Sequence, residues 1–237
     1  MGNIRKVSRK SIVRTTLFLT FLLSFTLGFR IFPGTNTWNI TPSDPTLWIQ
    51  VCSTPTFTDG SFPNGDILYN VNPTATQMIQ SILDNYNSFG ASFFPRLALY
   101  PTDPNNPPAP QPGDSAFTLA KANVRTISVC FNSQVFTGGY TQLKYDSSLN
   151  VIGCSIELSN ASIAKAQFFV SILTHELGHC FGLDHPQDTT KAVMSYFHDS
   201  AALRLENDDK MGLSFQYPAN PSWTKETPNF GLSCGPH

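Results

Sequence analysis

The spacing of hydrophobic and polar positions along the chain predicts three helices. In residues 74–86 apolar side chains recur at the i, i+3, i+4 spacing of an amphipathic helix, and Pro73 stands where a helix can begin. A longer helix is expected over residues 163–181. Residues 206–217 predict a closing helix, which Pro218 ends.

Five short segments rich in β-branched and aromatic residues predict strands. They are residues 48–52, 93–100, 124–131, 140–145 and 151–158. Residues 101–113 contain six prolines and therefore predict an irregular loop of polyproline character. The order of strand, helix, four strands and two helices predicts an α/β (α+β) fold, in one domain built on a mixed five-stranded sheet.

The first 30 residues predict export from the cytoplasm. Five bases in the first fourteen residues precede an unbroken apolar run over residues 17–29, as in a secretory signal peptide. The run is shorter than the roughly 20 apolar residues that span a bilayer. We expect cleavage between Thr26 and Pro33 and a secreted protein; the alternative is a retained N-terminal anchor. The chain then divides into residues 1–30, a folded domain over 31–218, and a C-terminal tail over 219–237.

Composition excludes several classes of protein. The chain is 41% hydrophobic and 13% charged over 237 residues, which excludes a disordered chain, a collagen and a coiled coil. Residues 31–237 hold nine bases and sixteen acids, so the domain lacks the basic surface of a nucleic-acid binder. Five cysteines in an exported protein are candidates for disulfides, but two bridges among five cysteines allow fifteen pairings, and the sequence does not choose among them.

Three of the five histidines fall within eleven residues and predict a zinc site. On a helix, His175 and His179 lie one turn apart and can bind one ion, and a turn at Gly182 can bring His185 to the same ion. Three protein ligands leave a fourth position for water, as in a catalytic zinc site, and Glu176 stands where it can take a proton from that water. The alternatives are a buried helix with hydrogen-bonded histidines and a zinc site without chemistry.

These residues satisfy every fixed position of H-E-x-x-H-x-x-G-x-x-H, and the chain resembles the metzincin clan of zinc endopeptidases. Met194, nine residues after the last histidine, resembles the methionine of the clan's methionine turn, which forms a hydrophobic floor beneath the metal. Residues 205–217 resemble the closing helix of matrixins. The resemblance therefore implies a matrixin-like catalytic domain, although the cysteine motif of the matrixin pro-segment is missing.

The resemblance also implies a mechanism and a substrate. Glu176 is expected to act as general base, and Tyr196 is expected to approach the metal or the oxyanion. A protein or peptide substrate is expected to pair with an edge strand, and residues 197–205 are expected to form the wall of the specificity pocket. The edge-strand residues concerned are Tyr140, Thr141, Gln142 and Leu143.

The sequence leaves alternatives open for two of the cysteines and for the activity. Cys180 is expected to pack in the core or form a disulfide rather than bind zinc, and Cys234 either staples the tail to the domain or caps the zinc in a latent enzyme. His198 and His237 are expected to be surface residues. One Zn²⁺ is expected, whereas Ca²⁺ has no supporting motif. We expect a monomeric endopeptidase; the alternative is a zinc-binding but latent or inactive surface module.

Overall fold

The fold is taken from a computed structural model. It describes residues 29–32, 37–38, 40, 45–52, 57, 73–89, 94–100, 125–132, 135, 138–159, 165–186, 192–196 and 202–218. Residues 1–28, the proline-rich segment 101–113 and the tail from residue 219 lie outside these ranges. Within the described ranges, no helix combines the length and the apolar character needed to cross a membrane.

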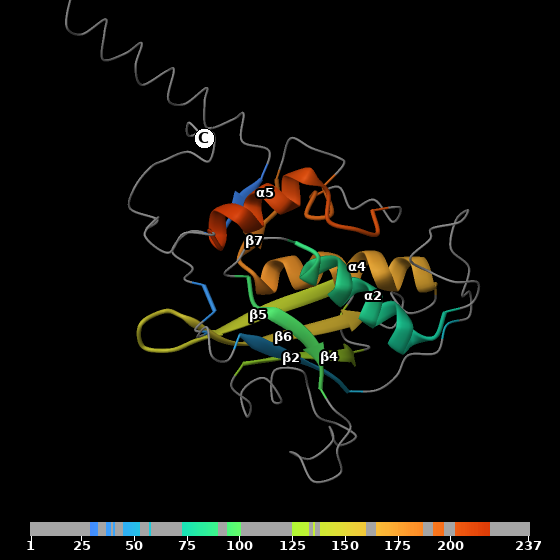
Figure 1. The fold of residues 1–237 in the computed structure, drawn as a ribbon. Helices are drawn as coiled ribbons and strands as arrows, with labels where there is room; N and C mark the ends of the chain where they lie inside the picture. Colours follow the sequence, from blue (N-terminus) through green and yellow to red (C-terminus); the bar gives the residue numbers. More distant parts are fainter. Residues whose placement is uncertain are drawn as a thin grey trace, which may run out of the picture.

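A mixed five-stranded sheet forms the base of the domain (Figure 1). Its strands are β2 (Thr46–Val51), β3 (Arg96–Leu99), β4 (Thr126–Asn132), β5 (Gly139–Tyr145) and β6 (Val151–Ser159). The spatial order is β3-β2-β4-β6-β5, and only β5 runs antiparallel to its neighbour. The predicted fold class is confirmed, and β5 lies at an edge of the sheet.

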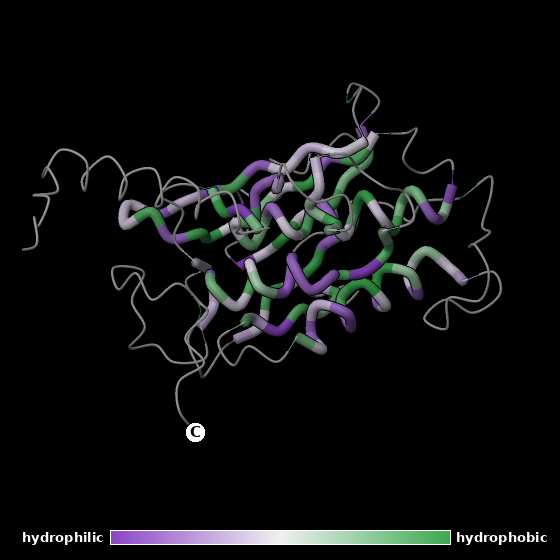
Figure 2. Tube along the Cα trace, turned by 90° about the horizontal axis from the view of Figure 1, so that it is seen from above, coloured by the Kyte–Doolittle hydropathy of each residue, from purple (hydrophilic) through white to green (hydrophobic). Residues whose placement is uncertain are grey.

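Two helices, α2 (Ala75–Asn87) and α4 (Ala166–Cys180), cover one face of this sheet, and α5 (Asn207–Gln216) lies beyond α4 (Figure 1). Helix α2 is capped by Thr74, whose hydroxyl and the side chain of Gln77 form a reciprocal capping box. Hydrophobic and hydrophilic residues are intermixed along the described chain (Figure 2). In α2 the buried residues recur three and four positions apart, as in a helix with one buried face.

Helix α4 is the centre of the core. All of its residues from Phe169 to Cys180 are buried, because it packs against the sheet on one side and against α2 and β7 on others. The hydroxyl of Tyr86 in α2 donates a hydrogen bond of 2.7 Å to the carbonyl of Thr174. A helix held on several sides can keep the side chains that it carries in fixed positions.

Two disulfides resolve the pairing that the sequence left open. Cys52 at the end of β2 pairs with Cys130 in β4, and Cys154 in β6 pairs with Cys180 at the end of α4. Cys180 therefore forms a disulfide, in agreement with one of the two roles expected for it. The fifth cysteine, Cys234, lies outside the described residues.

A pair of two-residue strands was not predicted. Strand β1 (Arg30–Ile31) pairs antiparallel with β7 (Leu183–Asp184), directly after α4. The rings of Phe29 and Phe215 lie 5.8 Å apart, so Phe29 also contacts α5. Phe29 and Arg30, which the sequence analysis placed in segment 1–30, thus pack against the folded domain.

Candidate active site

The three motif histidines converge on one point. The Nε2 atom of His185 lies 2.9 Å from Nε2 of His175 and 3.1 Å from Nε2 of His179. His175 and His179 project from successive turns of α4, as their spacing predicted, and His185 reaches them from the segment after β7. The structure thus brings together all three residues of the predicted metal group.

Backbone carbonyls fix two of the imidazole rings. Nδ1–H of His175 donates to the carbonyl of Val193 at 2.7 Å, and Nδ1–H of His179 donates to the carbonyl of Leu183 at 2.8 Å. Because a carbonyl only accepts, this proton sits on Nδ1 and leaves the lone pair of Nε2 pointing at the common centre. Burial also lowers the pKa of His179 to about 4, so this ring is neutral at pH 7.

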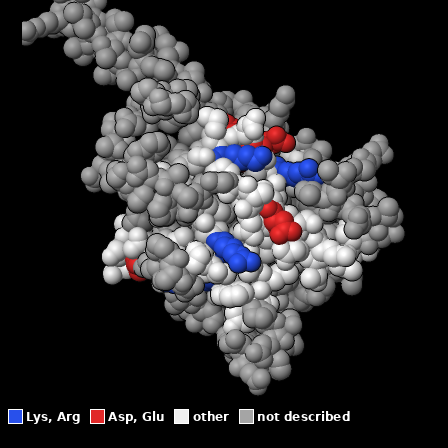
Figure 3. All heavy atoms as spheres, in the orientation of Figure 1, with Lys and Arg blue, Asp and Glu red and all other residues white. Residues whose placement is uncertain are grey.

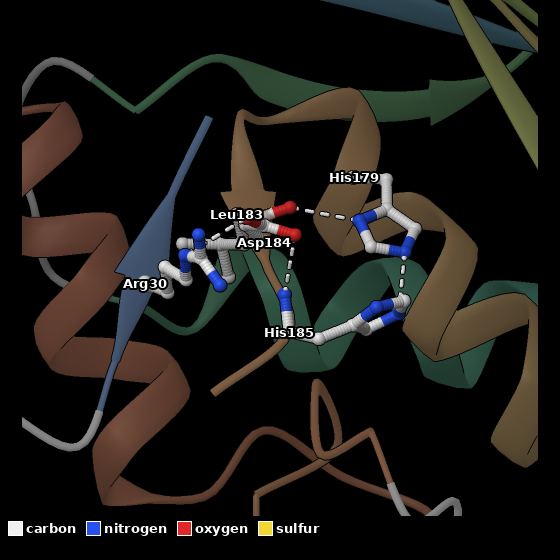
Figure 4. A network of polar contacts seen from close by, with 5 residues as sticks. All are labelled: Arg30, His179, Leu183, Asp184 and His185. Atoms are coloured by element: carbon white, nitrogen blue, oxygen red, sulfur yellow. Dashed lines mark hydrogen bonds and ion pairs between the residues drawn. The ribbon is translucent and has the colours of Figure 1, made fainter. Parts of the chain in front are cut away.

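A tight turn brings the third histidine into place. Gly182 has φ of 85°, a left-handed conformation that glycine adopts without strain, and it turns the chain two residues after α4 ends at Cys180. The Asp184 carboxylate then accepts a hydrogen bond from the backbone N–H of His185 at 2.8 Å and pairs with Arg30 at 3.2 Å (Figure 4). Strand β1 therefore holds the segment that carries His185 from outside the motif.

The donor set fits a zinc ion. Tetrahedral zinc with Zn–N bonds of 2.0–2.1 Å places its nitrogen ligands about 3.3 Å apart, close to the two Nε2–Nε2 distances of 2.9 and 3.1 Å. Two of the three imidazoles have outer hydrogen bonds to backbone carbonyls, as is typical of histidine ligands in a zinc site. The histidines, unlike those of an ordinary buried helix, direct their Nε2 atoms toward each other.

Glu176 lies beside this cluster with its carboxylate held in place. Its side chain is 6% exposed, and burial raises its pKa to about 7, although a hydrogen bond from Thr141 opposes this shift. The hydroxyl of Thr141 lies 2.5 Å from Oε2 of Glu176. A carboxyl group with a pKa near neutrality can both accept and return a proton at pH 7.

Met194, the residue predicted to form a methionine turn, contacts the helix that carries His175 and His179. Met194 is buried, and a Cβ atom at Gly178 would collide with its Sδ atom, so the side chain packs directly against the helix between the two histidines. The buried carboxylate of Asp209 in α5 accepts hydrogen bonds from the backbone N–H groups of Val193 and Met194, at 2.9 and 3.1 Å. No motif in the sequence singles out Asp209 for this contact.

An open cleft of about 1030 Å³ runs past these residues. All four predicted edge-strand residues of β5 line it, together with the histidines and Glu176. Tyr196 also lines the cleft; it is 67% exposed, and its ring lies 5.7 Å from the ring of His185. The face drawn in Figure 3 is mainly uncharged over the described residues, with no extended patch of either sign.

Phe32 is a cleft residue that sequence reasoning missed. Its ring lies 5.5 Å from the ring of His179, and its backbone N–H donates to the carbonyl of Gly182 at 3.0 Å. Of the predicted pocket wall, residues 197–201 lie outside the described ranges, and Leu203 and Leu205 are buried in the core. His198 and His237 also lie outside them.

Comparison with known proteins identifies the family. A search of curated protein sequences finds no significant match. Residues 102–218, which include all three histidines, Glu176 and Met194, match the sequence model of the matrixin family of peptidases. Matrixins are zinc-dependent peptidases, and the chain carries the three-histidine group that such a peptidase requires. The matched segment and the geometry of the histidines together show that the chain contains a matrixin-like domain.

Proposed function

We propose that the protein is a secreted zinc endopeptidase that cleaves protein or peptide substrates as a monomer. The observation that carries this proposal is the position of Glu176, which directly follows His175 on α4 and lines the same open cleft as the three histidines. A module that only binds zinc needs neither this carboxylate nor a cleft.

His175, His179 and His185 would hold the zinc ion. When bound, zinc supplies a Lewis acid that lowers the pKa of a water molecule and polarises the peptide carbonyl group. Glu176 accepts the proton of the attacking water and then returns it to the leaving amine. Tyr196, at the rim beside His185, donates a hydrogen bond to the carbonyl oxygen as negative charge develops there.

The substrate adds a strand to the sheet. Among the described residues β5 is the last strand of the sheet, which is the position where an extended peptide can add as a further strand. Tyr140 is 56% exposed and points away from the core, as expected for a residue that meets substrate side chains. Pairing along β5 would lead the scissile bond past Glu176.

Cleavage of casein or gelatin by the purified full-length chain tests the proposal. We expect cleavage that a zinc chelator stops and added zinc restores. Glu176→Ala should abolish cleavage but keep one zinc per chain by metal analysis, because Glu176 is not a ligand. Cleavage by this variant would contradict the mechanism. Zinc binding without any cleavage by the wild-type chain would favour a latent enzyme or a binding module, and absence of zinc would refute both.

A further inference from the structure

We propose that Thr141 positions the Glu176 carboxylate for proton transfer, and that Gly139 provides the space that this position requires. The inference rests on the proposed function, since it assigns a role in the same reaction. Thr141 was expected only as a residue of the substrate strand. In the structure its side chain points instead toward helix α4, where it contacts the general base.

The hydroxyl of Thr141 has two acceptors within reach, both on Glu176. It lies 2.5 Å from Oε2 of the carboxylate and 3.1 Å from the backbone carbonyl oxygen. A hydroxyl has one hydrogen to donate, and an ionised carboxylate only accepts. Charge-assisted O–H···O⁻ bonds are short and about twice as strong as neutral ones, so the hydroxyl donates to the carboxylate.

Gly139 approaches the other carboxylate oxygen. A Cβ atom at this position would lie 2.5 Å from Oε1 of Glu176 and 2.6 Å from its Cγ, closer than real Cβ contacts. Residues 139 and 141 point to the same face of β5, because side chains in a strand alternate. Strand β5 therefore lies against both carboxylate oxygens. Thr141 makes a hydrogen bond to Oε2, and Gly139, which has no side chain, leaves room for Oε1.

Positioning matters because the helix fixes only the backbone of Glu176. Its side chain adds three rotatable bonds, and it lines the cleft. A displacement of about 1 Å in a reacting group costs on the order of 100-fold in rate. The Thr141 hydroxyl selects the rotamer that keeps the carboxylate next to the histidines.

A purely structural role for Thr141 makes a different prediction. In that case its hydroxyl would serve only to tie β5 to α4, through the carbonyl of Glu176. Loss of the hydroxyl would then loosen the substrate strand and raise KM. A positioning role acts through the carboxylate and lowers kcat instead, and it disappears when the carboxylate is absent.

The test compares Thr141→Val, which keeps the shape but removes the hydroxyl, with Thr141→Ser, which keeps the hydroxyl. Thr126→Val is the matched control, because Thr126 is a buried threonine of β4 that does not line the cleft. We expect Thr141→Val to lower kcat about 10- to 100-fold with KM within about 2-fold. Thr141→Ser and the control should stay within about 3-fold of wild type.

Two further measurements make the result decisive. In the non-cleaving Glu176→Ala background, Thr141→Val should leave the Kd for a bound peptide substrate within about 2-fold, whereas a loosened substrate strand would raise that Kd. Crystal structures of the zinc-loaded wild type and Thr141→Val should show one Glu176 rotamer in the first and several in the second. A Thr141→Val enzyme with wild-type kcat, with raised KM alone, or with an unchanged Glu176 rotamer would overturn the proposal.

The rotamer comparison also separates this inference from the proposed function. A wild-type chain that binds zinc but cleaves nothing would refute the endopeptidase. The dispersal of the Glu176 side chain in Thr141→Val would still support its positioning by Thr141, and an unchanged side chain would still refute it.

Discussion

Removal of the Cys154–Cys180 disulfide should cost about 3.5 kcal/mol of stability. The bridge joins two cysteines 26 residues apart in sequence. The chain-entropy relation for a loop of about that length gives roughly 3.5 kcal/mol at 25 °C, as the entropy regained by the unfolded chain. The same relation gives about 4.5 kcal/mol for Cys52–Cys130, whose cysteines are 78 residues apart.

Urea denaturation of zinc-loaded Cys154→Ala/Cys180→Ala, with Cys52→Ala/Cys130→Ala as the matched comparison, measures both values. The 154–180 variant should also bind zinc more weakly, because Cys180 directly follows the ligand His179. The other pair joins β2 to β4, away from the histidines, and should leave zinc affinity within about 3-fold of wild type. A loss below about 1 kcal/mol in the first variant, or equal losses of zinc affinity in both, would refute the reasoning.

Three other predictions concern single residues of the site. In the zinc-free protein the pKa of Glu176 is raised to about 7, so the stabilisation that this side chain contributes is lost as pH rises from 4.5 to 7. The pKa of His179 is lowered to about 4, so the stabilisation that His179 contributes is lost as pH falls from 6.5 to 4. Glu176→Gln should therefore make unfolding free energy rise more steeply with pH between 5 and 6.5, by up to about 1.4 kcal/mol per pH unit in urea titrations, and an unchanged slope would contradict the shift. Gly178→Ala would drive a methyl group into Met194 and should cost about 1–3 kcal/mol, part of which Met194→Ala should restore in the double variant; strictly additive losses would exclude the contact. Asp209→Ala leaves three backbone N–H groups without their acceptor and should cost about 3 kcal/mol in thermal or urea unfolding, so a loss under about 1 kcal/mol would show that water replaces the carboxylate.

Most of the fold could be predicted because its larger elements carry clear periodic patterns. The helix predicted over residues 74–86 is α2 (Ala75–Asn87), shifted by one residue. The strand predicted over residues 93–100 is shorter, since β3 begins only after Pro95, which has no N–H to donate to the ladder. The helix predicted to reach residue 181 ends one residue earlier, where Gly182 turns the chain.

The parts that could not be predicted depend on contacts between distant residues. Strands of two residues, such as β1 and β7, are too short to show any alternation. Disulfide partners are set by which strands and helices become neighbours, and the sequence shows only spacing. The contact of Thr141 with Glu176 depends on how β5 packs against α4, and no pattern in the sequence indicates this packing. The zinc motif, in contrast, is local, because one helix and one turn bring its residues together.

The pairing of β1 with β7 has a consequence for the order of folding. Trp38, just after β1, donates a hydrogen bond from its indole to the carbonyl of Cys180, and these residues are 142 positions apart. Contacts this distant in sequence close large loops and form late, after local helices and hairpins. During synthesis from the N-terminus, nearly the whole domain must therefore be made before β1 and Trp38 can hold the segment that carries His185. The complete three-histidine site would then form in the last steps of folding, later than helix α4, which carries the first two histidines.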